Sequence, residues 1–135
     1  MNISFQRRTD LALGVLRALA AAPEVVAGAD LADEVGTTVS YLPQVMAPLI
    51  KAGWVASDRG PGGGYRLTGA ASDVRLLDVI EATEGPAADG RCVLRDAPCP
   101  GDEQCAVHVV WTEARRVLTE GFSAIAVIET TGGTT

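Results

Sequence analysis

The chain has 135 residues, of which 47% are hydrophobic, and its formal net charge at pH 7 is -6. This length fits one domain with its own hydrophobic core, and the apolar content excludes a largely disordered chain. No uninterrupted apolar run reaches the roughly 20 residues of a membrane span, and the N-terminus lacks the order of a secretory signal. We therefore expect a cytoplasmic protein with no membrane partner.

The negative charge is concentrated in the second half of the chain. Residues 1–70 carry six basic and six acidic side chains, whereas residues 71–135 carry five basic and eleven acidic ones. The N-terminal half is therefore neutral overall and can have a local basic face. The overall acidity neither supports nor excludes DNA binding.

The N-terminal half predicts a helix followed by a helix-turn-helix. The segment QRRTDLALGVLRALAAAP has apolar residues at helical spacing, which predicts a helix of about 15 residues that ends before Pro23. A short helix through Val35 and a second helix from about Val39 to Lys51 follow, joined by a turn at 36–38. Two helices joined by a short turn that contains glycine form a helix-turn-helix. A plain helical hairpin with polar residues in solvent is the alternative.

The second helix of such a unit presents its early residues to the DNA major groove. Hydroxyl and amide groups there can bond phosphates and base edges. The candidate side chains are Thr38, Ser40, Tyr41 and Gln44. Pro43 is compatible with the first turn of this helix, and we expect Pro48 to bend its end, because each proline removes a backbone donor.

The segment WVASDRGPGGGYRL predicts a β-hairpin with a glycine-rich tip. It is neither a P-loop, which needs Gly-Lys-Ser/Thr, nor a dinucleotide-binding turn, which needs a helix directly after the glycines. A hairpin directly after a helix-turn-helix is a wing, and Arg59 at its tip can enter a minor groove. The glycines allow the backbone to approach the sugar-phosphate edge closely. The two elements together indicate DNA binding.

Two further helices are expected in the second half. The segment SDVRLLDVIEATEG predicts a helix that Ser72 or Asp73 caps and Gly85 ends. A long helix from Ala106 to about Glu129 has apolar residues at alternating intervals of four and three, as in a coiled coil. The seam residues that we expect to contact a second subunit in a twofold dimer are Val107, Trp111, Leu118, Phe122 and Ile125. Packing of this helix on the chain's own core is the alternative.

All three cysteines and the only histidine lie within residues 92–108: Cys92, Cys99, Cys105 and His108. These side chains could hold an iron–sulfur cluster or zinc, or the thiols could form a switch without metal. The gaps of six and five residues between the cysteines are longer than in most zinc ligand pairs, which favours a cluster. An electron-transfer protein would have no use for a winged helix. A thiol oxidoreductase would need a C-x-x-C motif or an activated cysteine, so we do not expect an enzyme.

Three segments, SYLPQV, RGPGGGYRL and RCVLRDAPCPGDEQCAVHVVW, resemble the IscR/NsrR-type family of winged-helix, iron–sulfur-cluster-binding transcription regulators. The resemblance runs from about residue 3 to 130. It implies a mainly α fold with a small hairpin wing, a homodimer with crossing C-terminal helices, and promoter DNA as the partner. It also implies ligation by Cys92, Cys99 and Cys105. The DNA contacts that it implies are Ser40, Tyr41, Gln44, Arg59 and Gly60.

The fourth ligand distinguishes two branches of the family that the chain resembles. His108 matches the branch in which three cysteines and one histidine hold a 2Fe–2S cluster. Asp10 matches the nitric-oxide-sensing branch, in which a carboxylate from the partner subunit completes a 4Fe–4S site. We expect His108 and 2Fe–2S, because imidazole accompanies thiolates on iron. Two features depart from the family: the first cysteine gap is one residue longer than in close relatives, and Pro43 replaces an acidic residue.

These expectations divide the chain into four parts. Residues 1–85 form a winged helix-turn-helix domain, 86–105 a cluster-binding loop, 106–130 a dimerisation helix and 131–135 a flexible tail. The expected function is that of a transcription regulator, acting as a repressor, that senses redox state, nitric oxide or iron–sulfur status.

Overall fold

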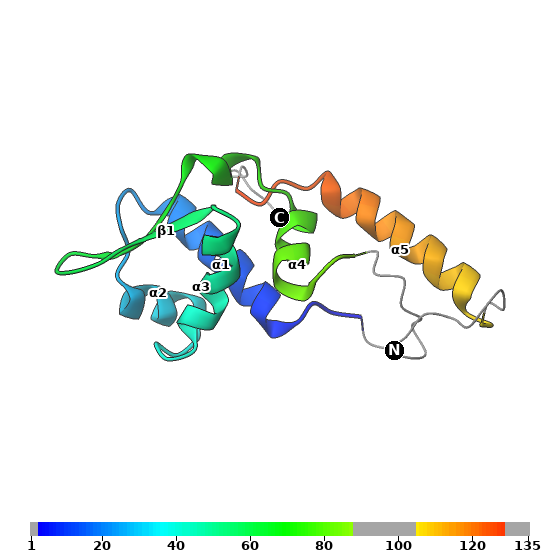
Figure 1. Cartoon of the computed structure of the whole chain (residues 1–135), viewed down its shortest axis with the longest axis horizontal. Coiled ribbons are helices and arrows are strands. Elements are labelled where there is room, and N and C mark those ends of the chain that lie inside the picture. The colour runs from blue at the N-terminus through cyan, green and yellow to red at the C-terminus, as the bar shows by residue number, and fades with distance from the viewer. Residues whose placement is uncertain (1–2, 88–104, 129–135) are drawn as a thin grey trace.

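The computed structural model describes residues 3–87 and 105–128. It is mainly α-helical with one antiparallel β-hairpin, as the sequence predicts (Figure 1). The helices are α1 (Arg7–Ala21), α2 (Gly28–Val35), α3 (Leu42–Lys51), α4 (Leu76–Glu84) and α5 (His108–Ser123). The strands are β1 (Val55–Asp58) and β2 (Gly64–Leu67), and a short 3-10 helix covers Gly69–Asp73. None of the helices in the described part is long and apolar enough to cross a membrane.

Helix α1 is the centre of the hydrophobic core and contacts α2, α3 and α4. Val15 and Leu16 of α1 are fully buried, as are Leu31 of α2 and Leu49 of α3. The N-terminal helix has the predicted length of 15 residues. The helix-turn-helix is therefore fixed to the rest of the protein by apolar packing along one face of each of its helices.

The turn of the helix-turn-helix is longer than the sequence predicts. Helix α2 ends at Gly36, whose φ of 83° is left-handed, a conformation that glycine adopts without a steric penalty. Helix α3 starts at Leu42 and not at Val39, because residues 39–41 form a turn in which the Thr38 carbonyl accepts both the Tyr41 N–H at 3.2 Å and the Leu42 N–H at 3.0 Å. Pro43 lies in the first turn of α3, as expected, and the helix continues through Pro48 to its last residue.

The hairpin is paired along both edges of β2. Strand β1 pairs with one edge, with Val55 opposite Leu67 and Asp58 opposite Gly64. On the other edge, the Tyr65 N–H donates to the Val26 carbonyl at 2.8 Å and the Val26 N–H donates to the Tyr65 carbonyl at 2.9 Å. The segment between α1 and α2 therefore holds β2 at Tyr65, one residue from the tip end of the paired ladder, while the tip itself projects from the body (Figure 1).

The backbone contacts of the hairpin explain why residues 63 and 64 are glycines. From the sequence, we expected the glycines to allow close approach to DNA. A Cβ on Gly64 would lie 2.1 Å from the Val26 carbonyl oxygen, and a Cβ on Gly63 would lie 2.2 Å from the Asp58 carbonyl oxygen. Gly64 also has a φ of 154°, which other residues rarely adopt. Both glycines are therefore required by the protein's own backbone.

Gly64→Ala is expected to destabilise the protein, because backbone strain alone costs about 1–3 kcal/mol at such a position and the new Cβ would break the Val26–Tyr65 pairing. Thermal unfolding of the variant measures this effect. Gly69→Ala is the matched control, since no atom lies within 4 Å of the Cβ position at Gly69. A Gly64→Ala variant that unfolds at the same temperature as the control would contradict this role.

Helices α4 and α5 both differ from their predicted bounds, for one reason. The chain directly before α4 pairs with the chain that follows α5: the Leu76 N–H donates to the Ile125 carbonyl at 2.8 Å and the Val127 N–H to the Val74 carbonyl at 3.2 Å. Helix α5 therefore ends at Ser123, well before the predicted Glu129. Val127 leaves the helix and enters the core, where it is 4% exposed.

The same pairing moves the start of α4. Ser72 and Asp73, the predicted caps, belong to the preceding 3-10 helix, and Arg75 is the N-cap instead. The Arg75 N–H donates to the Asp78 carboxylate at 2.8 Å, which satisfies one backbone donor at this helix end. The helix ends at Gly85, as expected.

Candidate functional site

The turn that precedes α3 exposes most of the predicted DNA-contacting side chains. Thr38, Ser40 and Gln44 are exposed, and Tyr41 is half-buried against the core. The Thr38 hydroxyl oxygen accepts the Tyr41 N–H at 3.1 Å and lies 3.2 Å from the Ser40 hydroxyl oxygen. Thr38 thus acts as a cap that fixes the backbone of the turn. Gln44 follows Ser40 by one helical turn and lies on the solvent side of α3.

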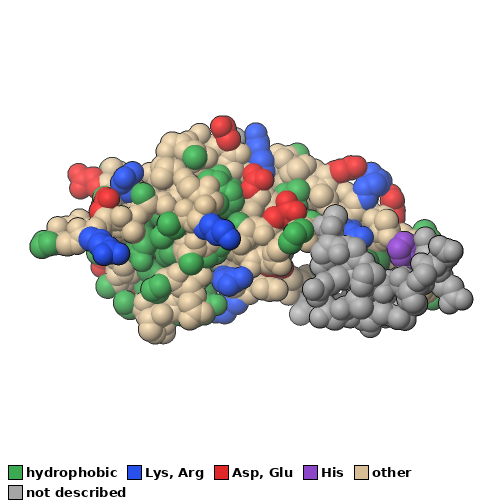
Figure 2. All heavy atoms as spheres, viewed as in Figure 1, with side chains coloured by type: hydrophobic (Ala, Val, Ile, Leu, Met, Phe, Trp, Pro, Cys, Tyr) green, Lys and Arg blue, Asp and Glu red, His purple; other side chains and the backbone are tan. Residues whose placement is uncertain are grey.

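The wing is the second exposed element of this region. Arg59 and Gly60 at its tip are exposed, and the left-handed φ of Gly60, 89°, fits the turn. Arg66 on β2 forms an ion pair with Asp58 on β1 at 3.3 Å. The helix-turn-helix and the wing occupy the end of the molecule opposite to α5 (Figure 1). Basic and acidic side chains are interspersed on the face shown in Figure 2, consistent with six of each in residues 1–70.

A buried polar cluster joins the start of α1 to the end of α4. The Gln6 N–H donates to the Glu84 carboxylate at 2.9 Å, and the Thr9 hydroxyl donates to the same carboxylate. The oxygens of Thr9 and Thr83 lie 2.7 Å apart, and Arg8 donates to the Thr83 carbonyl. Thr9 is fully buried and Thr83 is 2% exposed. These bonds hold the start of α1 against the end of α4, which precedes the cysteine-rich segment.

Two of the predicted metal ligands are within the described residues and lie three residues apart in the turn that leads into α5. Cys105 and His108 are both half-buried, and the His108 N–H donates to the Cys105 carbonyl at 3.0 Å. A thiolate and an imidazole at this spacing are suitable ligands for iron or zinc. Cys92 and Cys99 lie outside the described residues. Within residues 3–87 and 105–128, no three Cys, His, Asp or Glu side chains form a group that could hold a metal.

Asp10, the alternative fourth ligand, is exposed in the first turn of α1. An acidic side chain at this position also interacts favourably with the positive end of the helix dipole. Its carboxylate is accessible to a group outside the chain's own fold, and it is not part of the cluster formed by Thr9, Thr83 and Glu84.

Helix α5 extends from the body, and among the described residues it has an exposed apolar face. None of its 16 residues is buried. The exposed large apolar residues of α5 are Val109 at 70%, Val110 at 72%, Val117 at 54% and Leu118 at 38%. Val110 and Val117 are seven residues apart, so they lie on one face of the helix. Another side of α5 packs within the chain, where Phe122 contacts Phe5 edge to face at 5.6 Å between ring centroids.

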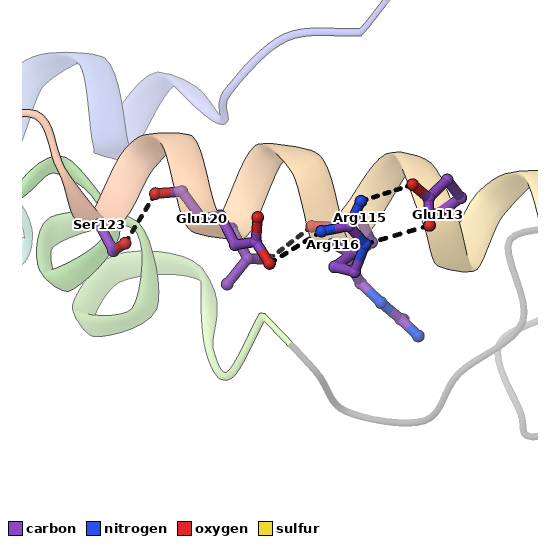
Figure 3. A network of polar contacts seen from close by, with 6 residues as sticks. Glu113, Arg115, Arg116, Glu120 and Ser123 are labelled. Carbon is purple, nitrogen blue, oxygen red and sulfur yellow. Dashed lines mark hydrogen bonds and ion pairs between the residues drawn. The ribbon is translucent and has the colours of Figure 1, made fainter.

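Three charged side chains of α5, those of Glu113, Arg116 and Glu120, are bonded to one another beside this apolar face. Arg116 donates two hydrogen bonds to Glu113, at 2.6 and 3.1 Å, and one to Glu120 at 2.9 Å (Figure 3). The pKa of the Glu113 carboxyl is lowered from its ordinary value, first by the hydrogen bonds from Arg116 and then by the charge of that guanidinium. These bonds stabilise the helix at its exposed surface.

A family model for Rrf2, iron-dependent transcriptional regulators, matches residues 5–129. The chain belongs to the Rrf2 family. The HTH-type transcriptional regulator IscR of Vibrio atlanticus is 44% identical over 85 residues, which cover 63% of this chain and 49% of the relative. The IscR of Photorhabdus laumondii is 37% identical over 101 residues, 75% of this chain and 61% of the relative. The chain therefore spans about half to three fifths of these Rrf2 relatives.

Solved structures have the same fold. The structure of CymR, the global cysteine regulator of B. subtilis, matches with a TM-score of 0.78 and 23% identity, over 99% of this chain and 100% of that one. IscR of T. potens matches with a TM-score of 0.76 and 23% identity, over 98% and 88% of the two chains. These matches confirm the winged-helix fold with a long C-terminal helix.

The sequence analysis missed two residues of the apolar face, Val110 and Val117. The predicted seam followed the apolar spacing from Val107. Its residues lie on two sides of α5, because Phe122 contacts Phe5 within the chain whereas Leu118 is exposed. The seven-residue spacing of the two valines, with Ala114 and Gly121 on the same face, was the signal that could have identified it.

Proposed function

We propose that this Rrf2-family protein binds promoter DNA as a homodimer and that an iron–sulfur cluster adjusts its DNA affinity. The observation that carries the proposal is the pairing of an exposed, capped recognition turn with a projecting wing at one end of the molecule. Ser40, Tyr41 and Gln44 would contact the major groove, with Thr38 fixing the turn. Arg59 and Gly60 would contact the adjacent minor groove.

Double-stranded DNA binding is tested with duplexes selected from a random pool by the purified protein. Anisotropy measurements at several salt concentrations should give a linear decrease of log affinity with log salt, because bound phosphates release counterions. A protein that enriches no duplex and has no salt-dependent affinity would overturn the DNA-binding proposal and revive an electron-transfer or thiol role.

Arg59→Ala is expected to weaken binding of the selected duplex by about 5- to 10-fold and to reduce the salt slope by about 1, since one phosphate or groove contact is lost. Arg17→Ala is the control, because it removes the same charge at an exposed residue of α1 that is not among the proposed DNA contacts. If Arg59→Ala retained both the affinity and the slope of the parent, the wing would have no part in DNA binding.

The proposed cluster ligands are Cys92, Cys99 and Cys105 with His108, and Asp10 is the alternative to the histidine. The donor set supports this assignment, because the turn that leads into α5 brings the sulfur-bearing Cys105 and the nitrogen-bearing His108 within three residues of each other. When bound, a 2Fe–2S cluster would supply a redox-active and nitrosylatable group, and 4Fe–4S is the alternative. Zinc or a metal-free thiol pair in the same residues is the runner-up.

An anaerobic absorbance spectrum with iron and sulfide analysis of freshly purified protein separates these cases. Two irons per chain with resolved bands would support 2Fe–2S, and four irons with one broad band would support 4Fe–4S. Zinc alone, or a colourless protein that remains empty after reconstitution, would overturn the cluster proposal and leave DNA binding unaffected.

The polar contacts between α1 and α4 support a physical connection between the proposed iron–sulfur cluster and the DNA-binding elements. Glu84 bonds Gln6 and Thr9 at the start of α1, and the cysteine-rich segment follows Glu84 by a few residues. Helix α1 in turn contacts both helices of the helix-turn-helix. A change in the cysteine-rich segment would therefore act on α1, and through it on the spacing of the two recognition helices in a dimer.

A further inference from the structure

Val39 is an exposed apolar residue in the recognition turn, and neither the fold nor the proposed polar contacts account for it. Its side chain is 60% exposed, whereas Leu42 and Val45, which follow in the same segment, are at most 1% exposed. Within residues 28–51, all of which the structure describes, Ile50 at the far end of α3 is the other large apolar residue with an exposed side chain.

The backbone on both sides of Val39 is held in place. Thr38 caps the Tyr41 N–H at 3.1 Å, and the hydroxyl oxygens of Thr38 and Ser40 lie 3.2 Å apart. Valine is β-branched and has few accessible rotamers, so a contact with this side chain loses little conformational entropy. Val39 is therefore a rigid apolar group between two polar residues that are proposed to approach the DNA backbone and bases.

The major groove has one strongly apolar feature at base edges, the C5-methyl group of thymine. We infer that Val39 contacts the C5-methyl of a thymine and selects thymine at that position of the bound site. The inference rests on the proposed DNA binding. It adds an apolar specificity-determining residue to the polar contacts proposed for the same turn. The polar side chains beside Val39 would position the protein, and the valine would distinguish thymine from bases without the methyl.

The test uses the duplex selected by the parent chain and replaces each thymine in turn by deoxyuridine, which lacks only the methyl. At one or more positions, the parent should bind the deoxyuridine duplex about fourfold more weakly for each methyl contacted. Val39→Ala should reduce this difference between the two duplexes, because both γ-methyl groups of the valine have been removed. Val39→Ala in the protein and thymine to deoxyuridine in the DNA form a double-mutant cycle. The cycle separates the energy of this one contact from general losses of affinity.

Val109→Ala is the matched control, since Val109 is another exposed valine, 70% accessible, on α5. Val109→Ala should retain the full difference in affinity between the thymine and the deoxyuridine duplexes. If Val39→Ala retained this difference as well, or if no thymine methyl affected binding by the parent, the inference would be overturned while DNA binding stood. A parent chain that selects no duplex would overturn the proposed function and this inference together.

Discussion

Cys105→Ala is expected to abolish iron binding. Loss of groups that only support a ligand already lowers metal affinity by about 10- to 100-fold, so loss of a direct thiolate ligand should exceed that range. The variant, purified anaerobically, should contain little iron and sulfide and should lack visible absorption. The fold should survive, because Cys105 lies outside the hydrophobic core and is not buried.

Thr112→Ala, an exposed change on α5, is the control and should retain the iron content of the parent. His108→Ala and Asp10→Ala extend the test to the fourth ligand. We expect His108→Ala to change the absorbance spectrum and Asp10→Ala to leave it unchanged. The opposite result would identify Asp10 as the fourth ligand. A Cys105→Ala protein with the parent's iron and spectrum would contradict the proposed ligand set.

Val117→Asp is expected to dissociate the proposed dimer. Val117 lies at the centre of the apolar face of α5, with Val110 seven residues before it and Leu118 beside it. An unpaired carboxylate buried at an interface costs about 3–5 kcal/mol, which corresponds to a rise of roughly a hundredfold or more in the dissociation constant. Sedimentation over a range of concentrations measures this change directly.

Thr112→Asp introduces the same charge at an exposed position on the opposite side of α5 and should leave the assembly intact. The parent chain is expected to be a dimer in this experiment. A monomeric parent, or a Val117→Asp variant that associates as tightly as the control, would mean that the apolar face has another occupant. Weaker DNA binding by the variant should accompany dissociation, since two linked half-sites bind with higher avidity than one.

Local sequence signals were sufficient for α1 and for the ends of α2 and α4. The leucine spacing and Pro23 predicted α1 with its observed length of 15 residues, and glycine at 36 and 85 marked two helix ends. The position of Pro43 in the first turn of α3 was also predicted correctly. These features depend on interactions within a few residues, which is why spacing and residue type reveal them.

The boundaries that the sequence missed depend on contacts between distant segments. Ile125 continues the apolar spacing of α5, yet its carbonyl bonds Leu76, far away in the chain, and the helix has already ended. Gly64 is explained by the Val26 carbonyl, which no local pattern indicates. The exposed face at Val110 and Val117 likewise became evident only when the fold showed which side of α5 the chain itself covers.

The most direct test of a cluster-controlled regulator is the affinity of one preparation for the selected duplex, measured with the cluster loaded and again after its removal. Coupling between the two sites of about 1–3 kcal/mol would change this affinity by about 5- to 150-fold. We expect such a change in the parent and none in Cys105→Ala. Equal affinity of the loaded and empty parent would contradict it.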